Sequence, residues 1–182
     1  MPACVALVRG INVGGRNLVA MADLRRLGER LGLEDVRSLL QSGNLVFRTR
    51  TVDTEALEAR LEHEAGKRLG LKAPAFFVRT ADEWAALVKK NPFRAEAERD
   101  PARLLAVLVK EAPRPAAVAA LRDAIRGSEQ VEARGRVAYF YYPDGVGRSK
   151  LTPAIVDRHL PGPGTARNWN TVLKLLALVH ST

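Results

Sequence analysis

Apolar residues in the first half of the chain follow two patterns, short continuous runs and recurrences at every third or fourth position. The recurrences predict helices with one apolar face, and the runs predict buried strands. Gly32 and Gly70 stand where the first two helices would end. Thr80 and Glu83 form the capping box of a third helix, which we expect to end near Asn91. The predicted elements before it are a strand at 3–9, a helix at 21–31, strands at 36–40 and 45–48, a helix at 54–69 and a strand at 75–79.

The same alternation begins again after residues 95–103, a charged stretch that contains a proline and lacks apolar periodicity. It predicts a strand at 104–109, a helix at 115–125, strands at 130–133 and 137–142, a helix at 153–159 capped by Thr152, an extended piece near Thr165 and a helix at 168–179. We therefore predict an α+β fold of two βαββαβα halves, with antiparallel or mixed sheets and helices packed on them. The predicted domains are 1–94 and 102–182.

This order of elements also predicts where the polar loops lie. A right-handed crossover makes the first two strands of each half parallel, with the third strand returning between them. In the first half, the segments GINVGG (10–15) and QSGN (41–44) should then share one end of a sheet. In the second half, GVGRSK (145–150) and TARNWNT (165–171) should meet at the opposite end.

Composition excludes several classes of protein. The chain has 182 residues and is 47% hydrophobic, which is ample for a packed core. Its formal charge of +9 divides into +4 for residues 1–91 and +5 for residues 92–182, so no concentrated basic stripe marks a dedicated nucleic-acid reader. The single cysteine, Cys4, excludes an intramolecular disulfide, and the three isolated histidines give no support for a metal site. We expect a cytoplasmic protein without a membrane segment, a metal or a cofactor.

The first-half loops combine glycine with amide side chains. In GINVGG, backbone amides could approach an oxyanion while a cation at the strand end supplies charge, although neither the dinucleotide fingerprint nor the Walker spacing is present. The alternative is a tight turn that uses positive φ angles, and a hairpin turn explains QSGN equally well. The ligand-binding candidates in these loops are Arg9, Asn12, Gln41, Ser42 and Asn44.

The second-half loops are richer in positive charge. GVGRSK offers a guanidinium, a hydroxyl and an ammonium group, which together could hold a phosphate. RNWNT adds a further arginine and two asparagines around Trp169. The alternatives are a solvated loop, a helix cap and a core tryptophan. The ligand-binding candidates here are Arg148, Ser149, Lys150, Arg167, Asn168 and Asn170.

Four segments, LVRGINVGG, QSGNLVF, GVGRSKL and RNWNT, occur in this order over nearly the full chain. Together they resemble the uncharacterised bacterial family 1697 of domains of unknown function. The NPF at 91–93 also resembles a motif from the middle of that family's sequence. The resemblance implies a cytoplasmic α+β protein with ferredoxin-like repeats. It implies no established activity and no catalytic residue.

Three classes of function stay open at this point. The leading hypothesis is binding of an anionic ligand, either a phosphate-bearing small molecule or a nucleic-acid backbone, with Arg148, Lys150, Arg167 and Asn168 as the contact. The second is an enzyme acting on a phosphorylated or carboxylated small molecule, in which Ser149 or an asparagine positions the reacting group. The third is a structural or interaction protein whose motifs join the halves or a second subunit. The aromatic run at 139–142 fits either core packing or base stacking. The oligomeric state is left open.

Overall fold

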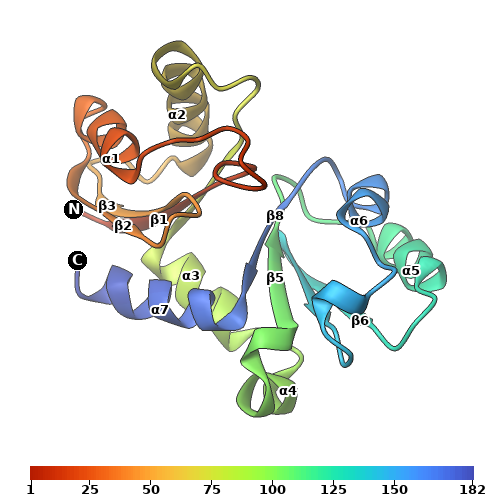
Figure 1. Cartoon of the computed structure of the whole chain (residues 1–182). Helices are drawn as coiled ribbons and strands as arrows, with labels where there is room; N and C mark the ends of the chain where they lie inside the picture. The colour runs from red at the N-terminus through yellow and green to blue at the C-terminus, as the bar shows by residue number, and fades with distance from the viewer. The chain divides into compact units, whose positions relative to one another are not determined.

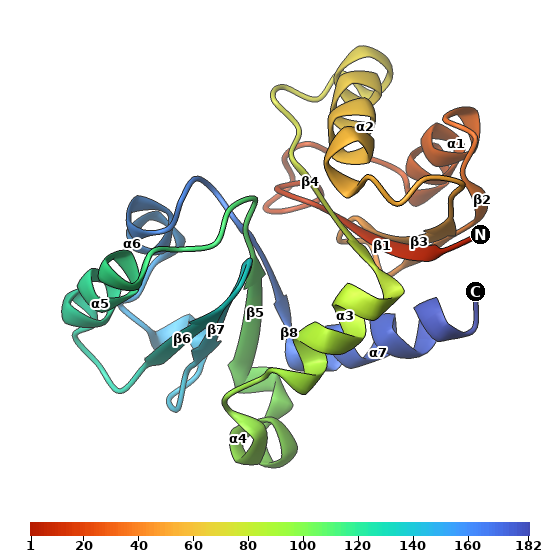
Figure 2. The same cartoon turned by 180° about the vertical axis from the view of Figure 1, so that it is seen from behind.

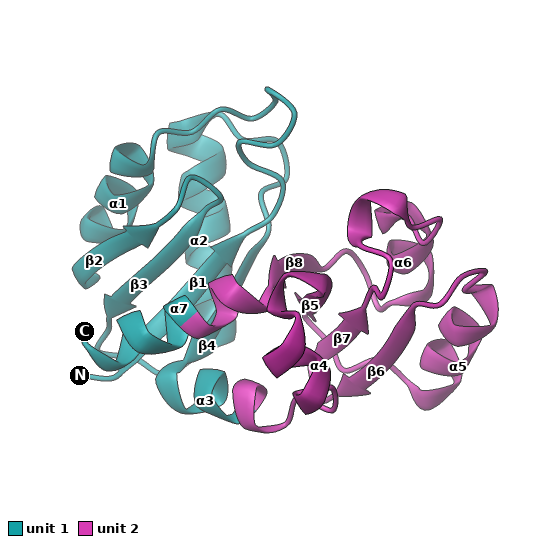
Figure 3. Cartoon of the chain, turned by 60° about the horizontal axis from the view of Figure 1, so that its bottom comes forward, with its two compact units in different colours: residues 1–86, 174–182 teal, residues 87–173 magenta.

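The computed structural model describes all 182 residues of the chain, which form two compact units. One unit comprises Met1–Ala86 and Lys174–Thr182, and the other comprises Leu87–Leu173 (Figure 3). The division falls within two helices, α3 (Ala81–Lys89) and α7 (Trp169–His180). The bounds of these units differ from those of the predicted domains, 1–94 and 102–182, which stay a prediction.

The first unit contains a four-stranded sheet in the order β2-β3-β1-β4, in which all neighbouring strands are antiparallel. Helices α1 and α2 lie on the same face of this sheet (Figure 1). The third strand runs between the first two, as the crossover rule predicts. The elements are β1 (Ala3–Val8), α1 (Met21–Arg30), β2 (Glu34–Leu39), β3 (Asn44–Arg48), α2 (Thr54–Leu69) and β4 (Phe76–Thr80).

The second unit repeats this order with a sheet arranged as β6-β7-β5-β8, again wholly antiparallel. Helices α5 and α6 lie on one face of the sheet (Figure 2). The predicted α+β fold with two similar halves is therefore confirmed, and both sheets are antiparallel rather than mixed. The elements are β5 (Leu104–Leu108), α5 (Pro115–Ala124), β6 (Gln130–Arg134), β7 (Val137–Tyr141), α6 (Pro153–His159) and β8 (Thr165–Asn168).

The charged stretch at 95–103 has regular structure although it lacks apolar periodicity. It forms a short helix, α4 (Arg94–Arg99), and a 3-10 turn, η1 (Pro101–Arg103). The backbone N–H of Asp100 donates to the carbonyl of Glu96, and the Asp100 carboxylate pairs with Arg103 at 2.8 Å. Because local hydrogen bonds and ion pairs hold these elements, they need no apolar face, and the sequence shows no apolar periodicity. A further 3-10 turn, η2 (Val146–Arg148), lies in the GVGRSK segment.

Each unit has a core between its sheet and two helices. In the first, Ala6 and Val8 face α1 and α2, while Val5 and Leu7 are equally buried on the opposite face. The parts of α3 and α7 that belong to this unit lie on that opposite side in Figures 1 and 2. Both faces of the sheet are therefore covered, and the continuous apolar run of β1 follows from this. None of the helices has the length and apolar content needed to span a membrane.

One buried ion pair joins α2 to β4. Glu58 Oε1 accepts a hydrogen bond of 2.7 Å from the backbone N–H of Val78 and lies 3.4 Å from Arg79 Nη1. Both charged side chains are only 4% exposed. Charges are rarely buried in this way unless they are paired and hydrogen-bonded, so this contact fixes α2 against the sheet.

Candidate anion-binding site

The structure brings the first-half loops together, as the strand order predicted. The backbone N–H of Val8 donates to the carbonyl of Gly43 at 2.8 Å, and the Asn12 side-chain amide donates to the carbonyl of Gln41 at 2.7 Å. Gly43 has a φ of +74°, and a Cβ there would lie 2.8 Å from a side-chain atom of Ile11. The glycine is thus required both by the turn and by close packing.

The asparagines of these loops hold the backbone in place. The Asn12 side chain also accepts from the N–H of Val19 and donates to its carbonyl, at 2.8 and 2.9 Å. Asn44 is fully buried and donates to the carbonyl of Leu39 and the hydroxyl of Ser42, both at 2.9 Å. The turn interpretation therefore accounts for both amides.

The other candidates of the first half lie at the rim of the same loops. Gln41 is exposed, while Arg9 and Ser42 are half-buried. The backbone N–H of Arg9 donates to the carbonyl of Ala75 at 2.9 Å, which ties its backbone to the segment before β4. Ligand binding by the five first-half candidates stays a prediction.

The predicted meeting of the two second-half segments stays a prediction, because the chain leaves them on different faces of the sheet. Leu151, which follows GVGRSK directly, packs with Phe140 in the core beneath α5 and α6. Trp169 instead contacts Tyr139, with their ring centroids 6.3 Å apart. Adjacent residues of a strand point to opposite faces, so Leu151 and Trp169 pack on opposite faces of the second sheet. The strand order places both segments at one end of the sheet but does not determine the face on which each chain leaves.

Most polar groups of RNWNT have structural roles. Asn168 Oδ1 accepts from the backbone N–H of Thr171 at 3.0 Å and caps α7. Arg167 Nη1 donates to the Thr165 hydroxyl and to the carbonyl of Ala166, both at 2.8 Å. Burial lowers the pKa of Arg167 to about 10, so it remains a cation at neutral pH. Asn170 is exposed on the first turn of α7. Ligand binding by these three candidates stays a prediction.

Of the two interpretations of the aromatic residues, core packing and base stacking, the structure supports core packing. Trp169 is 4% exposed, and the four aromatic residues at 139–142 are all buried. The Tyr139 hydroxyl donates to the carbonyl of Leu87 at 2.7 Å. Burial raises the pKa of Tyr142 to about 12, and the nearby Glu129 carboxylate contributes to the shift. None of these rings presents an open face for base stacking.

The GVGRSK segment retains two cations without hydrogen-bond or ion-pair partners. Arg148 and Lys150 are exposed on either side of Ser149. The Ser149 hydroxyl donates to Glu129 Oε1 and accepts from the N–H of Leu151 at 2.9 Å. The other oxygen of Glu129, Oε2, is buried and has no hydrogen-bond partner. Sequence reasoning missed Glu129, although an antiparallel β6–β7 hairpin would have placed residue 129 beside the segment after residue 142.

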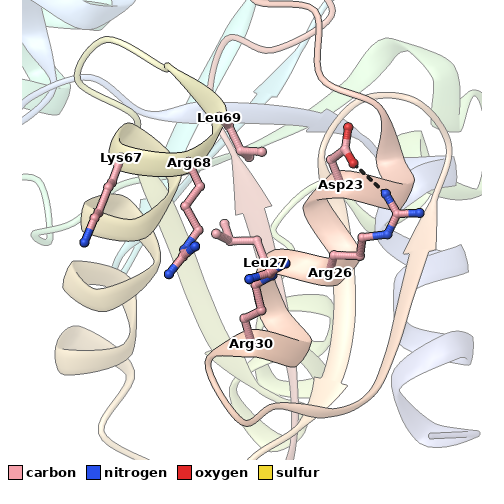
Figure 4. A pocket seen from close by; sticks show the side chains of 7 residues that line it. All are labelled: Asp23, Arg26, Leu27, Arg30, Lys67, Arg68 and Leu69. Carbon is pink, nitrogen blue, oxygen red and sulfur yellow. Dashed lines mark hydrogen bonds and ion pairs between the residues drawn. The ribbon is translucent and has the colours of Figure 1, made fainter.

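A cationic groove that the sequence did not predict lies between α1 and α2. It encloses about 620 Å³ and is open to solvent. Figure 4 shows Arg30 and Arg68 extending into the space between the two helices, while Arg26 turns towards Asp23. The lining residues are Asp23, Arg26, Leu27 and Arg30 from α1, and Lys67, Arg68 and Leu69 from α2.

Positive charge is in excess on the lining of the groove. Arg26 Nη1 pairs with Asp23 at 2.9 Å, and Arg68 Nε pairs with Glu64. The hydrogen bond from Arg68 lowers the pKa of Glu64, which therefore stays ionised at neutral pH. Neither Arg30 nor Lys67 has an ion-pair or hydrogen-bond partner for its side chain, so both are available to an incoming anion.

Local helix physics explains only part of this cluster. Arg30, Lys67 and Arg68 stand in the last turns of their helices, where positive charge favours the negative end of the helix dipole. Arg26 lies a turn earlier, on the same face as Arg30. Packing of two helices on one sheet then brings the four cations together, and this proximity cannot be seen in either helix alone.

Comparison with known proteins places this chain in a family. The family described as protein of unknown function (DUF1697) matches residues 1–139. The chain belongs to this family. A solved structure, the conserved bacterial protein SP0830 from Streptococcus pneumoniae, is similar over 98% of both chains, with a TM-score of 0.75 and 24% sequence identity. This likeness shows the fold alone, and a comparison with curated proteins finds no match.

Proposed function

We propose that this protein binds an anionic ligand, a phosphate-bearing small molecule or a nucleic-acid backbone, in the groove between α1 and α2. The observation that supports this most strongly is the convergence of four cations around one cavity, two of them without partners. Guanidinium groups suit this task because their planar donors match two oxygens of a phosphate. A volume of about 620 Å³ also falls within the range that small-molecule sites occupy.

The sequence prediction of Arg148, Ser149 and Lys150 gives a second location for the same function. Two partner-free cations support this location, but the Glu129 carboxylate bonded to Ser149 would repel an anion. The groove has the stronger case, because its four cations outnumber the two carboxylates that pair with them, Asp23 and Glu64. We also propose a cytoplasmic location, which the single buried thiol of Cys4 suits.

Pyrophosphate titration by isothermal calorimetry tests the function and its location together. Arg30→Ala/Lys67→Ala should weaken binding at least tenfold without loss of stability, because neither side chain has a partner in the fold. The matched control, Lys90→Ala/Arg126→Ala, removes two exposed cations elsewhere and should stay within twofold of the unchanged protein. If Arg148→Ala/Lys150→Ala abolishes binding while the groove variant binds normally, the site lies in GVGRSK and the groove assignment is wrong.

A second candidate function, an enzyme, has one specific observation in its favour. The Ser149 hydroxyl donates to a carboxylate whose other oxygen is buried and unbonded, as in a hydroxyl oriented for transfer chemistry. Arg148 and Lys150 would stabilise negative charge on the transferring group. Ser149→Ala should then abolish hydrolysis of a phosphate-ester or carboxylate-ester probe while the variant keeps the circular dichroism spectrum of the folded protein. Equal turnover by the variant and the unchanged protein would exclude this candidate.

A further inference from the structure

We infer that the groove takes a small diphosphate ester rather than a nucleic-acid strand, an inference that rests on the function proposed above. The charge of the lining is the first reason. Its four cations are offset by Asp23 and by Glu64, which pairs with Arg68, so two positive charges remain in excess. Two phosphate groups bring roughly three to four negative charges, whereas a nucleic-acid strand brings one for each nucleotide. A ligand with one or two phosphates therefore matches the lining better than an extended strand.

Within the segment that builds the two helices, the excess positive charge lies at the groove. Residues 21–72, which contain both helices and the strands between them, have ten basic and nine acidic side chains and hence a net charge of only +1. The two helices also carry carboxylates outside the lining, among them Glu29 on α1 and Glu55 on α2. Extended polyanions require a continuous basic track, so this local distribution favours a ligand that ends within the groove.

The cations approach from two sides, which suits linked phosphates. Arg26 and Arg30 are four residues apart on α1 and so lie on one face, about 6 Å apart along the axis. Arg68 extends from α2 into the same space (Figure 4). One phosphate can thus meet α1 while its neighbour meets α2. A single phosphate would contact the cations of only one helix.

The groove also contains apolar surface for the body of an ester. Leu69 lines it beside the cations and is only partly buried by the core, whereas Leu27 beneath it is 2% exposed. Ligand sites typically combine apolar contacts with a few polar groups that fix orientation. A body attached to the phosphates would therefore gain contact with the Leu69 side chain, which inorganic pyrophosphate cannot.

The test compares four probes by calorimetry at one low ionic strength: ADP, AMP, pyrophosphate and a single-stranded oligonucleotide of twenty bases. ADP should bind at least tenfold more tightly than AMP and no more weakly than pyrophosphate. Arg30→Ala/Lys67→Ala should reduce ADP affinity at least tenfold, and Lys90→Ala/Arg126→Ala should change it less than twofold. The oligonucleotide should bind more weakly than ADP, and the groove variant should leave its affinity within twofold.

Failure of the inference and failure of the proposed function give different results. If AMP binds as well as ADP, or if the oligonucleotide binds more tightly and loses affinity in the groove variant, the diphosphate assignment is overturned while anion binding in the groove stands. If no probe responds to Arg30→Ala/Lys67→Ala, both are overturned.

Discussion

Replacement of the buried Glu58 should be the most destabilising polar change in the first unit. In Glu58→Leu, the N–H of Val78 loses an acceptor at 2.7 Å, and the carboxylate facing Arg79 at 3.4 Å is removed. A buried donor left without its acceptor costs about 1–3 kcal/mol. Removal of one partner from a buried ion pair costs about 3–5 kcal/mol in total. Because the two effects share one carboxylate, we expect a loss of about 3–5 kcal/mol rather than their sum.

Urea unfolding followed by circular dichroism measures this loss. The control is Glu64→Ala, on the same helix, where the half-buried carboxylate pairs with the exposed Arg68 four residues later. Helix pairs at this spacing contribute about 0.3–0.5 kcal/mol, so this change should move the transition far less than Glu58→Leu. The double variant Glu58→Leu/Arg79→Met removes both charges and should be more stable than Glu58→Leu alone. A loss below about 1 kcal/mol for Glu58→Leu would refute the reasoning.

Three further predictions concern residues that the sequence singled out. Asn168→Ala removes the cap of α7 and should cost about 1 kcal/mol in urea unfolding, whereas exposed Asn170→Ala should cost less than about 0.5 kcal/mol; equal costs would contradict the capping role. Gly43→Ala should cost about 2–4 kcal/mol by the same assay, because its φ is +74° and its Cβ would meet Ile11 at 2.8 Å, and a neutral result would exclude this strain. Burial raises the pKa of Cys4 to about 11, so at pH 8 the folded protein should resist a disulfide reagent that labels the urea-unfolded chain at once.

Hydrophobic periodicity was sufficient to predict the architecture of both halves. The first two helices of the first half each show an apolar face and are followed by a glycine. The strands show continuous apolar runs, as expected of a sheet that is buried on both faces. Periodicity could not predict α4, because no residue of that helix is buried. Nor could periodicity predict that the boundary between the two compact units falls within α3 and α7, because the apolar faces of these helices do not indicate which sheet they cover.

The candidate site was harder to predict, because motifs rich in glycine and asparagine serve turns as readily as ligands. Asn12, Asn44 and Asn168 all bond to backbone within their own unit, as turn and cap residues do. Arg30 and Arg68 belong to no motif and look like ordinary helix-terminal cations in the sequence. Their proximity depends on the packing of α1 beside α2, which local sequence patterns do not encode.

The most direct test of anion binding in the groove is a nuclear magnetic resonance titration of the labelled protein with ADP. Signals of Arg30, Lys67 and Arg68, including the arginine side-chain N–H groups, should shift progressively and saturate, while those of Arg148 and Lys150 stay in place. Shifts confined to residues 145–150, or no saturable shift in either helix, would contradict the account.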